Sequence, residues 1–232
     1  STYGSTNQHP SFSDVCKEVA ELSKYDGPVL IPVFSIGRSI EILQLLRRYD
    51  VVGNRVWYDG MISDVLPIYR GYASDEYMSS SLTNRIKHSG LPQPFLPEGA
   101  RTPHNMIERN KIVKQEDNPI IVTPSGMLTG GWSPFYLGQM TDYRDKARVI
   151  IVGYQAEGTV GRELINAKER GEASTSVDIR TFVYPAEGES SDLESPGFVD
   201  KTIEVPMEWI EYKRGFSAHS SASHLLECPS IA

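Results

Sequence analysis

Residues 29–34 (VLIPVF) constrain the fold most, because this segment is apolar at every position. A strand with one face in water alternates apolar and polar residues, whereas a strand apolar on both faces is typical of a buried, parallel sheet. The turn 35–38 follows and leads into a predicted helix, whose apolar face is formed by Ile42, Leu45, Leu46 and Tyr49.

The same order of strand, glycine-bearing turn and amphipathic helix recurs along the chain. Further strands are predicted over 55–58, 120–123 and 148–153, and further helices over 11–24, 61–72 and 159–169. Residues 73–118 are polar and rich in proline and glycine, so we expect separate helical pieces there. Two extended segments, 174–184 and 203–212, follow. The pattern predicts an α/β fold with a largely parallel sheet flanked by helices.

Composition limits the class of protein. A chain of 232 residues with 39% hydrophobic and 23% charged residues is typical of a globular protein with one large domain or two small ones. No apolar run is long enough for a transmembrane helix, and no N-terminal signal pattern is present. Cys16 and Cys228 are too few for a disulfide framework. We therefore expect a cytoplasmic protein without a membrane partner.

The acidic charge is concentrated in one segment. The formal net charge is −7, and residues 185–200 contain five acids and no base. Removing these five charges from the total leaves −2 for the remainder. We interpret 185–200 as a solvated acidic loop insert. A local basic groove for nucleic acid elsewhere remains compatible with this composition.

The turns after the strands are the candidate binding sites, because ligands of parallel sheets gather at the carboxyl ends of the strands. In the turn 35–38, Gly37 and Arg38 stand where a helix begins. Free N–H groups and the helix dipole suit a phosphate there, and Arg38 could add a bidentate contact. An ordinary turn with a surface arginine is the alternative.

Two later turns have similar chemistry. Residues 125–131 (SGMLTGG) could present several N–H groups of Ser125, Gly126 and Met127 to one anion, or could simply allow tight packing. In 153–162, Thr159 is a predicted N-cap, and the candidate substrate contacts are Gln155 and Arg162. Neither a GxGxxG nor a GxxxxGK[ST] pattern occurs in that turn, so a doubly wound nucleotide-binding domain ranks last among our hypotheses.

The five histidines do not form a metal-binding pattern. None of them has HxH or HxxxH spacing with another, and the two cysteines form no CxxC pair, so we expect no zinc site built from this chain alone. His219 lies at a strand-to-helix junction among serines that include Ser217. A histidine there could act as a general acid or bind phosphate. A hydrogen-bonding histidine at a helix start is the alternative.

Several segments in fixed order resemble a known family. They are STYG at the start, VLIPVFSIGRSIEILQLL, VWYDGMI, IIVTPSGMLTGG, VIIVGYQAEGTVGREL and GFSAHS. Together they resemble the β-CASP domain of metallo-β-lactamase-fold ribonucleases, and most of all archaeal proteins similar to the nuclease subunit of the cleavage and polyadenylation specificity factor. The resemblance extends to about residue 228, which implies a single β-CASP domain over 1–232.

The resemblance implies zinc-dependent hydrolysis of RNA phosphodiester bonds, in RNA 3′-end processing or decay. In that family the β-CASP domain covers a two-metal site in the metallo-β-lactamase domain, where the metals activate water. His219 matches the histidine of the FSAH motif and would assist the leaving oxygen. The implied RNA and phosphate contacts are Gly37, Arg38, Ser125, Gly126, Met127, Gln155, Thr159, Arg162 and Ser217.

The chain also departs from the family pattern. The HxHxDH metal-binding run is missing, and Ser221 stands where the family has an aspartate after FSAH. By resemblance, the acidic partner of His219 would precede Ser1 and a distal ligand histidine would follow Ala232. We therefore expect the metallo-β-lactamase half and its zinc to belong to the parent protein, and this chain alone to be inactive. The parent could form a homodimer. The alternative function is a non-catalytic RNA-binding or assembly module on the same scaffold.

Overall fold

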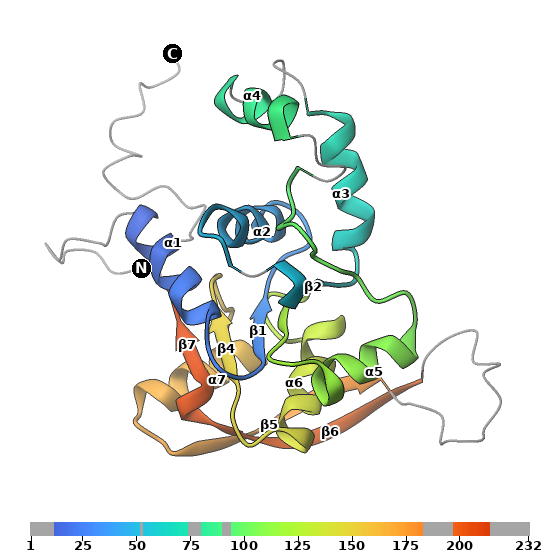
Figure 1. The fold of residues 1–232 in the computed structure, drawn as a ribbon. Coiled ribbons are helices and arrows are strands. Elements are labelled where there is room, and N and C mark those ends of the chain that lie inside the picture. Colours follow the sequence, from blue (N-terminus) through green and yellow to red (C-terminus); the bar gives the residue numbers. More distant parts are fainter. Residues whose placement is uncertain (1–11, 52, 74–79, 90–93, 183–196, 214–232) are drawn as a thin grey trace, which may run out of the picture.

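The computed structural model describes residues 12–51, 53–73, 80–89, 94–182 and 197–213. In these residues, five strands form one sheet in the order β2-β3-β1-β4-β7, and every neighbouring pair is parallel (Figure 1). The predicted α/β fold with a parallel sheet is confirmed. The strands are β1 (Val29–Pro32), β2 (Val56–Tyr58), β3 (Ile120–Thr123), β4 (Arg148–Ile151) and β7 (Ile210–Tyr212).

Helices cover both faces of the sheet, and a β-hairpin packs on the outer side of the helices that cover one face. The helices are α1 (Phe12–Ser23), α2 (Arg38–Arg48), α3 (Ile62–Gly71), α4 (Ser80–Ser89), α5 (Met106–Gln115), α6 (Trp132–Tyr143) and α7 (Val160–Glu169). The antiparallel hairpin of β5 (Ser174–Phe182) and β6 (Phe198–Pro206) packs against α6 and α7. Short 3-10 turns occupy Gly53–Arg55 and Met207–Trp209.

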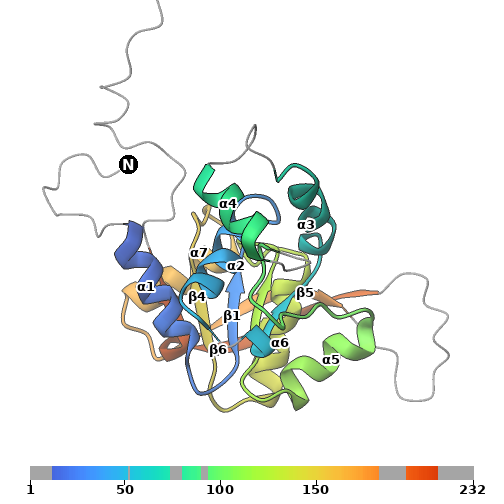
Figure 2. The same cartoon turned by 45° about the horizontal axis from the view of Figure 1, so that its top comes forward.

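The strands are apolar on both sides because each side faces a core. Leu30 of β1 packs in one cluster with α5, α6, α7 and the hairpin. Its neighbours Val29 and Ile31 pack in a second cluster with residues of α1, α2 and α3. Figure 2 shows the ribbons of these three helices together with β1. Val29, Leu30 and Ile31 are all fully buried. The apolar pattern of 29–31 therefore follows from burial on both faces, as predicted from the sequence. The strand ends at Pro32, and Phe34, which we expected to continue it, is 44% exposed.

Two segments differ from their predicted form. The extended segment 203–212 is divided, because β6 ends at Pro206, a 3-10 turn follows, and β7 then joins the main sheet beside β4. Residues 198–200, which we assigned to the acidic loop, belong to β6 and pair with 180–182 of β5. The prediction that residues 198–200 are part of a loop is wrong, because backbone pairing with β5 extends β6 as far as Phe198.

Some predicted features lie outside the described residues. Among them are the rest of the acidic loop up to residue 196, Ser217 and His219. In the described part of the chain, no helix has the length and apolar character needed to cross a membrane.

Candidate functional site

Three turns meet at the carboxyl edge of the sheet, because they follow the neighbouring strands β3, β1 and β4. The Gln155 side chain after β4 donates a hydrogen bond from Nε2 to the carbonyl oxygen of Gly126 after β3, at 2.8 Å. The N–H of Gly161 donates to the carbonyl oxygen of Met127 at 3.2 Å. Residues about thirty positions apart in the sequence are therefore held together by direct contacts.

The first turn places an arginine at the start of α2. Gly37 is the N-cap residue and has a φ of 75°, a left-handed conformation that favours glycine. Arg38 follows it and forms an ion pair with Glu41, whose side chain is 52% exposed. The side chain of Arg38 itself is 14% exposed, so a phosphate that reaches its guanidinium would have to compete with the more exposed Glu41.

The second turn uses its hydroxyl groups to hold its own shape. The Oγ of Ser125 accepts a hydrogen bond from the N–H of Thr129 at 3.0 Å. The Oγ of Ser133, in the first turn of α6, donates to the carbonyl oxygen of Ser125 at 2.6 Å. Gly131 has a φ of 63°, and a Cβ atom there would lie 2.9 Å from the carbonyl oxygen of Pro124. The loop is thus fixed from both ends, with Ser125 and Met127 half-buried at the edge.

The third turn contains the predicted N-cap and a second arginine. The Oγ1 of Thr159 accepts a hydrogen bond from the N–H of Arg162, so the N-cap prediction is confirmed. The Arg162 guanidinium donates to the carbonyl oxygen of Gln155, at 3.0 Å from Nε. Gln155 itself is fully buried. Its amide therefore ties two turns together and does not face the solvent, where we had expected it to contact RNA.

Replacing Gly161 by alanine will destabilise the protein, although alanine favours helices. The new Cβ would lie 1.8 Å from Oε1 of the buried Gln155, so that amide must move and lose its bond to Gly126. We expect the free energy of unfolding to fall by about 1–3 kcal/mol. Gly71→Ala is the matched control, because no atom lies within 4 Å of its Cβ position. Urea unfolding should show a loss only for Gly161→Ala, and equal effects would contradict this reading.

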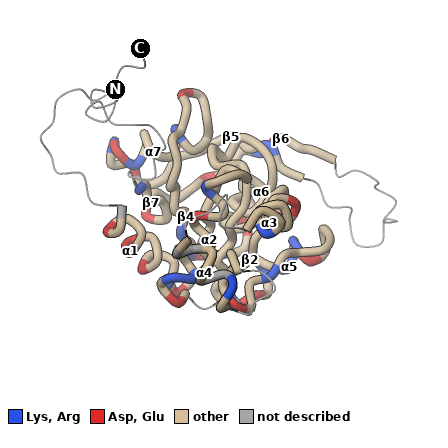
Figure 3. Tube along the Cα trace, turned by 90° about the horizontal axis from the view of Figure 1, so that it is seen from above, with Lys and Arg blue, Asp and Glu red and all other residues tan. Residues whose placement is uncertain are grey.

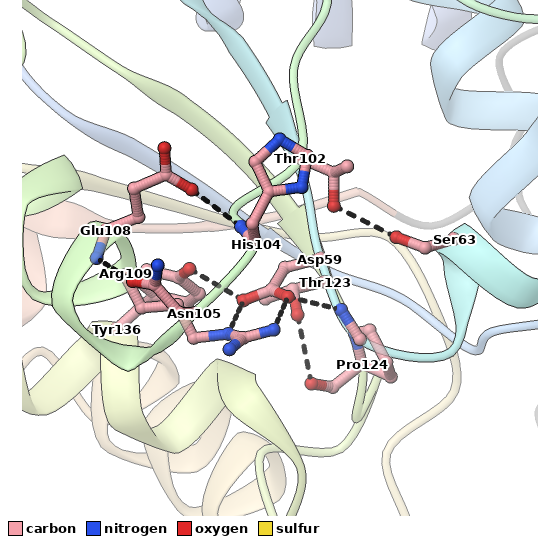
Figure 4. Close-up of polar contacts among 11 residues, drawn as sticks. Asp59, Ser63, Thr102, His104, Asn105, Glu108, Arg109, Thr123, Pro124 and Tyr136 are labelled. Atoms are coloured by element: carbon pink, nitrogen blue, oxygen red, sulfur yellow. Dashed lines mark hydrogen bonds and ion pairs between the residues drawn. The ribbon is translucent and has the colours of Figure 1, made fainter. Parts of the chain in front are cut away.

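A buried ion pair supports the same edge from the side of β2 (Figure 4). Asp59 follows β2 and is only 1% exposed. Its two carboxylate oxygens accept hydrogen bonds from Nε and Nη2 of Arg109 in α5, at 2.8 and 2.9 Å. The phenol of Tyr136 in α6 donates to the same carboxylate at 2.7 Å. This cluster of Asp59, Arg109 and Tyr136 joins a strand and two helices.

The cluster also contacts the second turn. The guanidinium of Arg109 lies 4.1 Å from the ring centroid of Trp132, and the backbone N–H of Trp132 donates to the carbonyl oxygen of Pro124. Asp59 directly follows the buried strand β2, and this position is the sequence signal that could have identified it. Burial raises the pKa of the neighbouring Tyr58 phenol above its ordinary value, because the phenolate would be desolvated.

The described residues do not fit a zinc site. Nowhere in the described ranges do three His, Cys, Asp or Glu side chains come close enough to hold a metal ion. The buried Asp59 carboxylate is already occupied by Arg109 and Tyr136. We therefore assign no metal ligand and no metal-dependent step to this part of the chain.

Comparison with known proteins agrees with the motifs. The sequence model of the Beta-Casp domain matches residues 39–164, which include the second and third turns. Proteins named transcription termination factor FttA are similar: that of Methanocaldococcus jannaschii is 34% identical over 202 residues, covering 81% of this chain and 31% of its own length. That of Thermococcus kodakarensis is 32% identical and covers 97% of this chain and 32% of its own.

An RNase J-like protein of Methanocaldococcus jannaschii is 32% identical over 178 residues, covering 74% of this chain and 39% of its own length. The chain thus spans about a third of the length of the curated relatives it matches. The family match covers more than half of the chain and contains β2, β3, β4 and the second and third turns, whereas β1 and the first turn precede it. The chain therefore belongs to the Beta-Casp domain family.

Proposed function

We propose that this chain is the RNA-facing β-CASP part of a zinc-dependent ribonuclease that acts in RNA 3′-end processing or decay. The observation that carries the proposal is the meeting of three turns at one edge, with Arg38 and Arg162 in the first turns of α2 and α7. Helix N-termini and arginines are the groups that bind phosphates. The names of the relatives, a termination factor and an RNase J-like protein, support RNA as the ligand.

The positive charge at this edge comes from separate arginines. In the view from above, Lys and Arg positions are interspersed with Asp and Glu over the described elements (Figure 3). The side chains of Arg38 and Arg162 are 14% and 20% exposed, and both pair with more exposed glutamates. RNA phosphates would compete with Glu41 and Glu157 for these two guanidinium groups. The two arginines would then define two points on the path of the RNA backbone.

The proposed division of labour assigns the metals to the rest of the parent protein. Zinc bound there would supply a water activated for attack on phosphorus. This chain would hold the RNA backbone with Gly37, Arg38, Ser125, Gly126 and Met127, together with Thr159, Arg162 and Ser217. His219 would hold a proton for the leaving oxygen. The buried Gln155 would hold the second and third turns together through its hydrogen bond to Gly126.

Replacing Arg38 by alanine will weaken RNA binding by about 10- to 150-fold, because a charge-assisted contact is worth about 1.5–3 kcal/mol. The probe is a labelled single-stranded RNA titrated with the 232-residue chain by fluorescence anisotropy at several salt concentrations. The salt dependence should also decrease by about one counterion in Arg38→Ala.

Arg48→Ala is the matched control, because Arg48 is exposed and ends the same helix that Arg38 begins. It should bind RNA like the wild type. If Arg38→Ala and Arg48→Ala bind equally well, or if the wild-type chain shows no salt-dependent RNA binding, the proposed function is wrong.

A further inference from the structure

Two aromatic rings are exposed at the edge where the three turns meet. Phe34 follows β1 and is 44% exposed, and Tyr154 follows β4 and is 57% exposed. These strands are neighbours in the sheet, so the two rings come from adjacent turns. Neither ring is needed to complete the cores of the protein, which are built from other residues.

The ring of Phe34 lies against the backbone of both neighbouring turns. A Cβ atom on Gly126 would lie 3.4 Å from Cδ2 of Phe34, and one on Gly153 would lie 3.7 Å from its Cε2. One side of the ring is therefore supported by glycine backbone, while almost half of the residue is open to solvent. A ring held in this way can offer a face to a planar ligand without first being ordered.

Tyr154 has a cationic neighbour. The guanidinium carbon of Arg162 lies 5.9 Å from its ring centroid, within the range of cation–π contacts. Exposed aromatic rings beside arginines are the combination that binds single-stranded nucleic acid, since bases stack on the rings and phosphates pair with the cations. An apolar protein surface would fit less well, because covering the rings would also desolvate Arg162 and the polar turn around Ser125.

We propose that Phe34 and Tyr154 form a stacking platform for unpaired bases of RNA, while the adjacent arginines hold its phosphates. This inference rests on the proposed function and narrows its ligand to single-stranded RNA. Stacking accepts every base, because each has a π face, so the platform favours unpaired over paired RNA without reading a sequence.

The test is a double-mutant cycle between the protein and the bases. The 232-residue chain is titrated with a ten-nucleotide single-stranded RNA and with an oligomer of ten abasic ribose phosphates, which has the same charge. Phe34→Ala and Tyr154→Leu should each weaken binding of the intact RNA by about 5- to 100-fold. Both should leave binding of the abasic oligomer unchanged. Phe34→Trp and Tyr154→Trp should retain wild-type affinity, which distinguishes a stacking role from damage to the fold.

Tyr143→Leu is the matched control. Tyr143 is 51% exposed and has Lys114 over its ring at 4.1 Å, but it ends α6, the helix that starts from the turn after β3, and so lies towards the opposite edge of the sheet. It should not change RNA binding. Equal losses on intact and abasic oligomers, or no loss on either, would overturn the stacking platform. If wild type binds neither oligomer, the proposed function fails as well, so the two failures are distinguishable.

Discussion

Replacing Arg109 by methionine will lower the free energy of unfolding by about 3–5 kcal/mol. The substitution keeps a side chain of similar length but removes the guanidinium, and with it the contact with the Trp132 ring and both hydrogen bonds to Asp59. Asp59 is 1% exposed, so its carboxylate would stay buried, and among the described residues it would keep the hydrogen bonds from Tyr136 and the N–H of Gly60. Removing one partner of a buried ion pair costs more than the pair itself contributes, because the remaining charge is uncompensated.

Replacing Asp59 by asparagine should cost less than Arg109→Met. The side chain of Arg109 is 16% exposed, so water can partly solvate the guanidinium that loses its partner. The double variant should be more stable than the sum of the two single losses predicts, because neither charge is then left alone. Urea unfolding of the two single variants and the double variant measures this coupling.

Lys201→Met provides the control for charge loss. Lys201 pairs with Asp142 at 2.6 Å, but both side chains are more than a third exposed. Its loss should change stability by no more than about 1 kcal/mol. If Arg109→Met lowers the free energy of unfolding by no more than Lys201→Met does, the cluster of Asp59, Arg109 and Tyr136 is solvated in solution and does not stabilise the carboxyl edge of the sheet.

The parts of the fold that could be predicted from the sequence are those with local signals. The strand 120–123 was predicted with its observed bounds, because an apolar run ends there at Pro124. Helix α7 was found from its N-cap Thr159 and its apolar periodicity. The helix α5 had an unused signal: Asn105 caps it by accepting from the N–H of Glu108, whose carboxylate accepts from the N–H of His104, a variant of the capping box.

What could not be predicted depends on contacts between distant residues. Asp59 forms hydrogen bonds with Arg109 and Tyr136, which are 50 and 77 residues away in the sequence, and no helical or strand periodicity predicts such a contact. The three-residue strand β7 exists because Ile210 pairs with Val149 of β4. Likewise, Gln155 has a side chain suited to ligand contact, and only the packing of two turns around it shows that it is buried. The residue type of Gln155 suggested ligand contact, whereas its burial in the folded chain shows that it holds two turns together.

Replacing His219 by alanine in the full-length parent protein should lower the rate of RNA cleavage by about 10²- to 10⁴-fold, the usual contribution of a general acid. RNA affinity should change little, because in the proposed function Arg38 and the three turns hold the RNA backbone. Single-turnover cleavage and anisotropy on the same variant separate the two effects. His88→Ala is the control, since His88 is an exposed histidine of α4 that hydrogen-bonds the carbonyl oxygen of Asn84.

A substrate with sulfur in place of the leaving oxygen tests the role of His219 as a proton donor. A thiol has a pKa of about 8.5, so a thiolate leaves without needing a proton, whereas an alkoxide needs one. The sulfur substrate should therefore restore most of the rate lost in His219→Ala. If the loss is the same for both substrates, His219 does not donate the proton and acts through binding or folding. If the full-length wild-type protein binds RNA but cleaves neither substrate, the alternative function, a non-catalytic RNA-binding module, is the correct one. The proposed role of the arginines and turns in holding RNA would then stay unchanged.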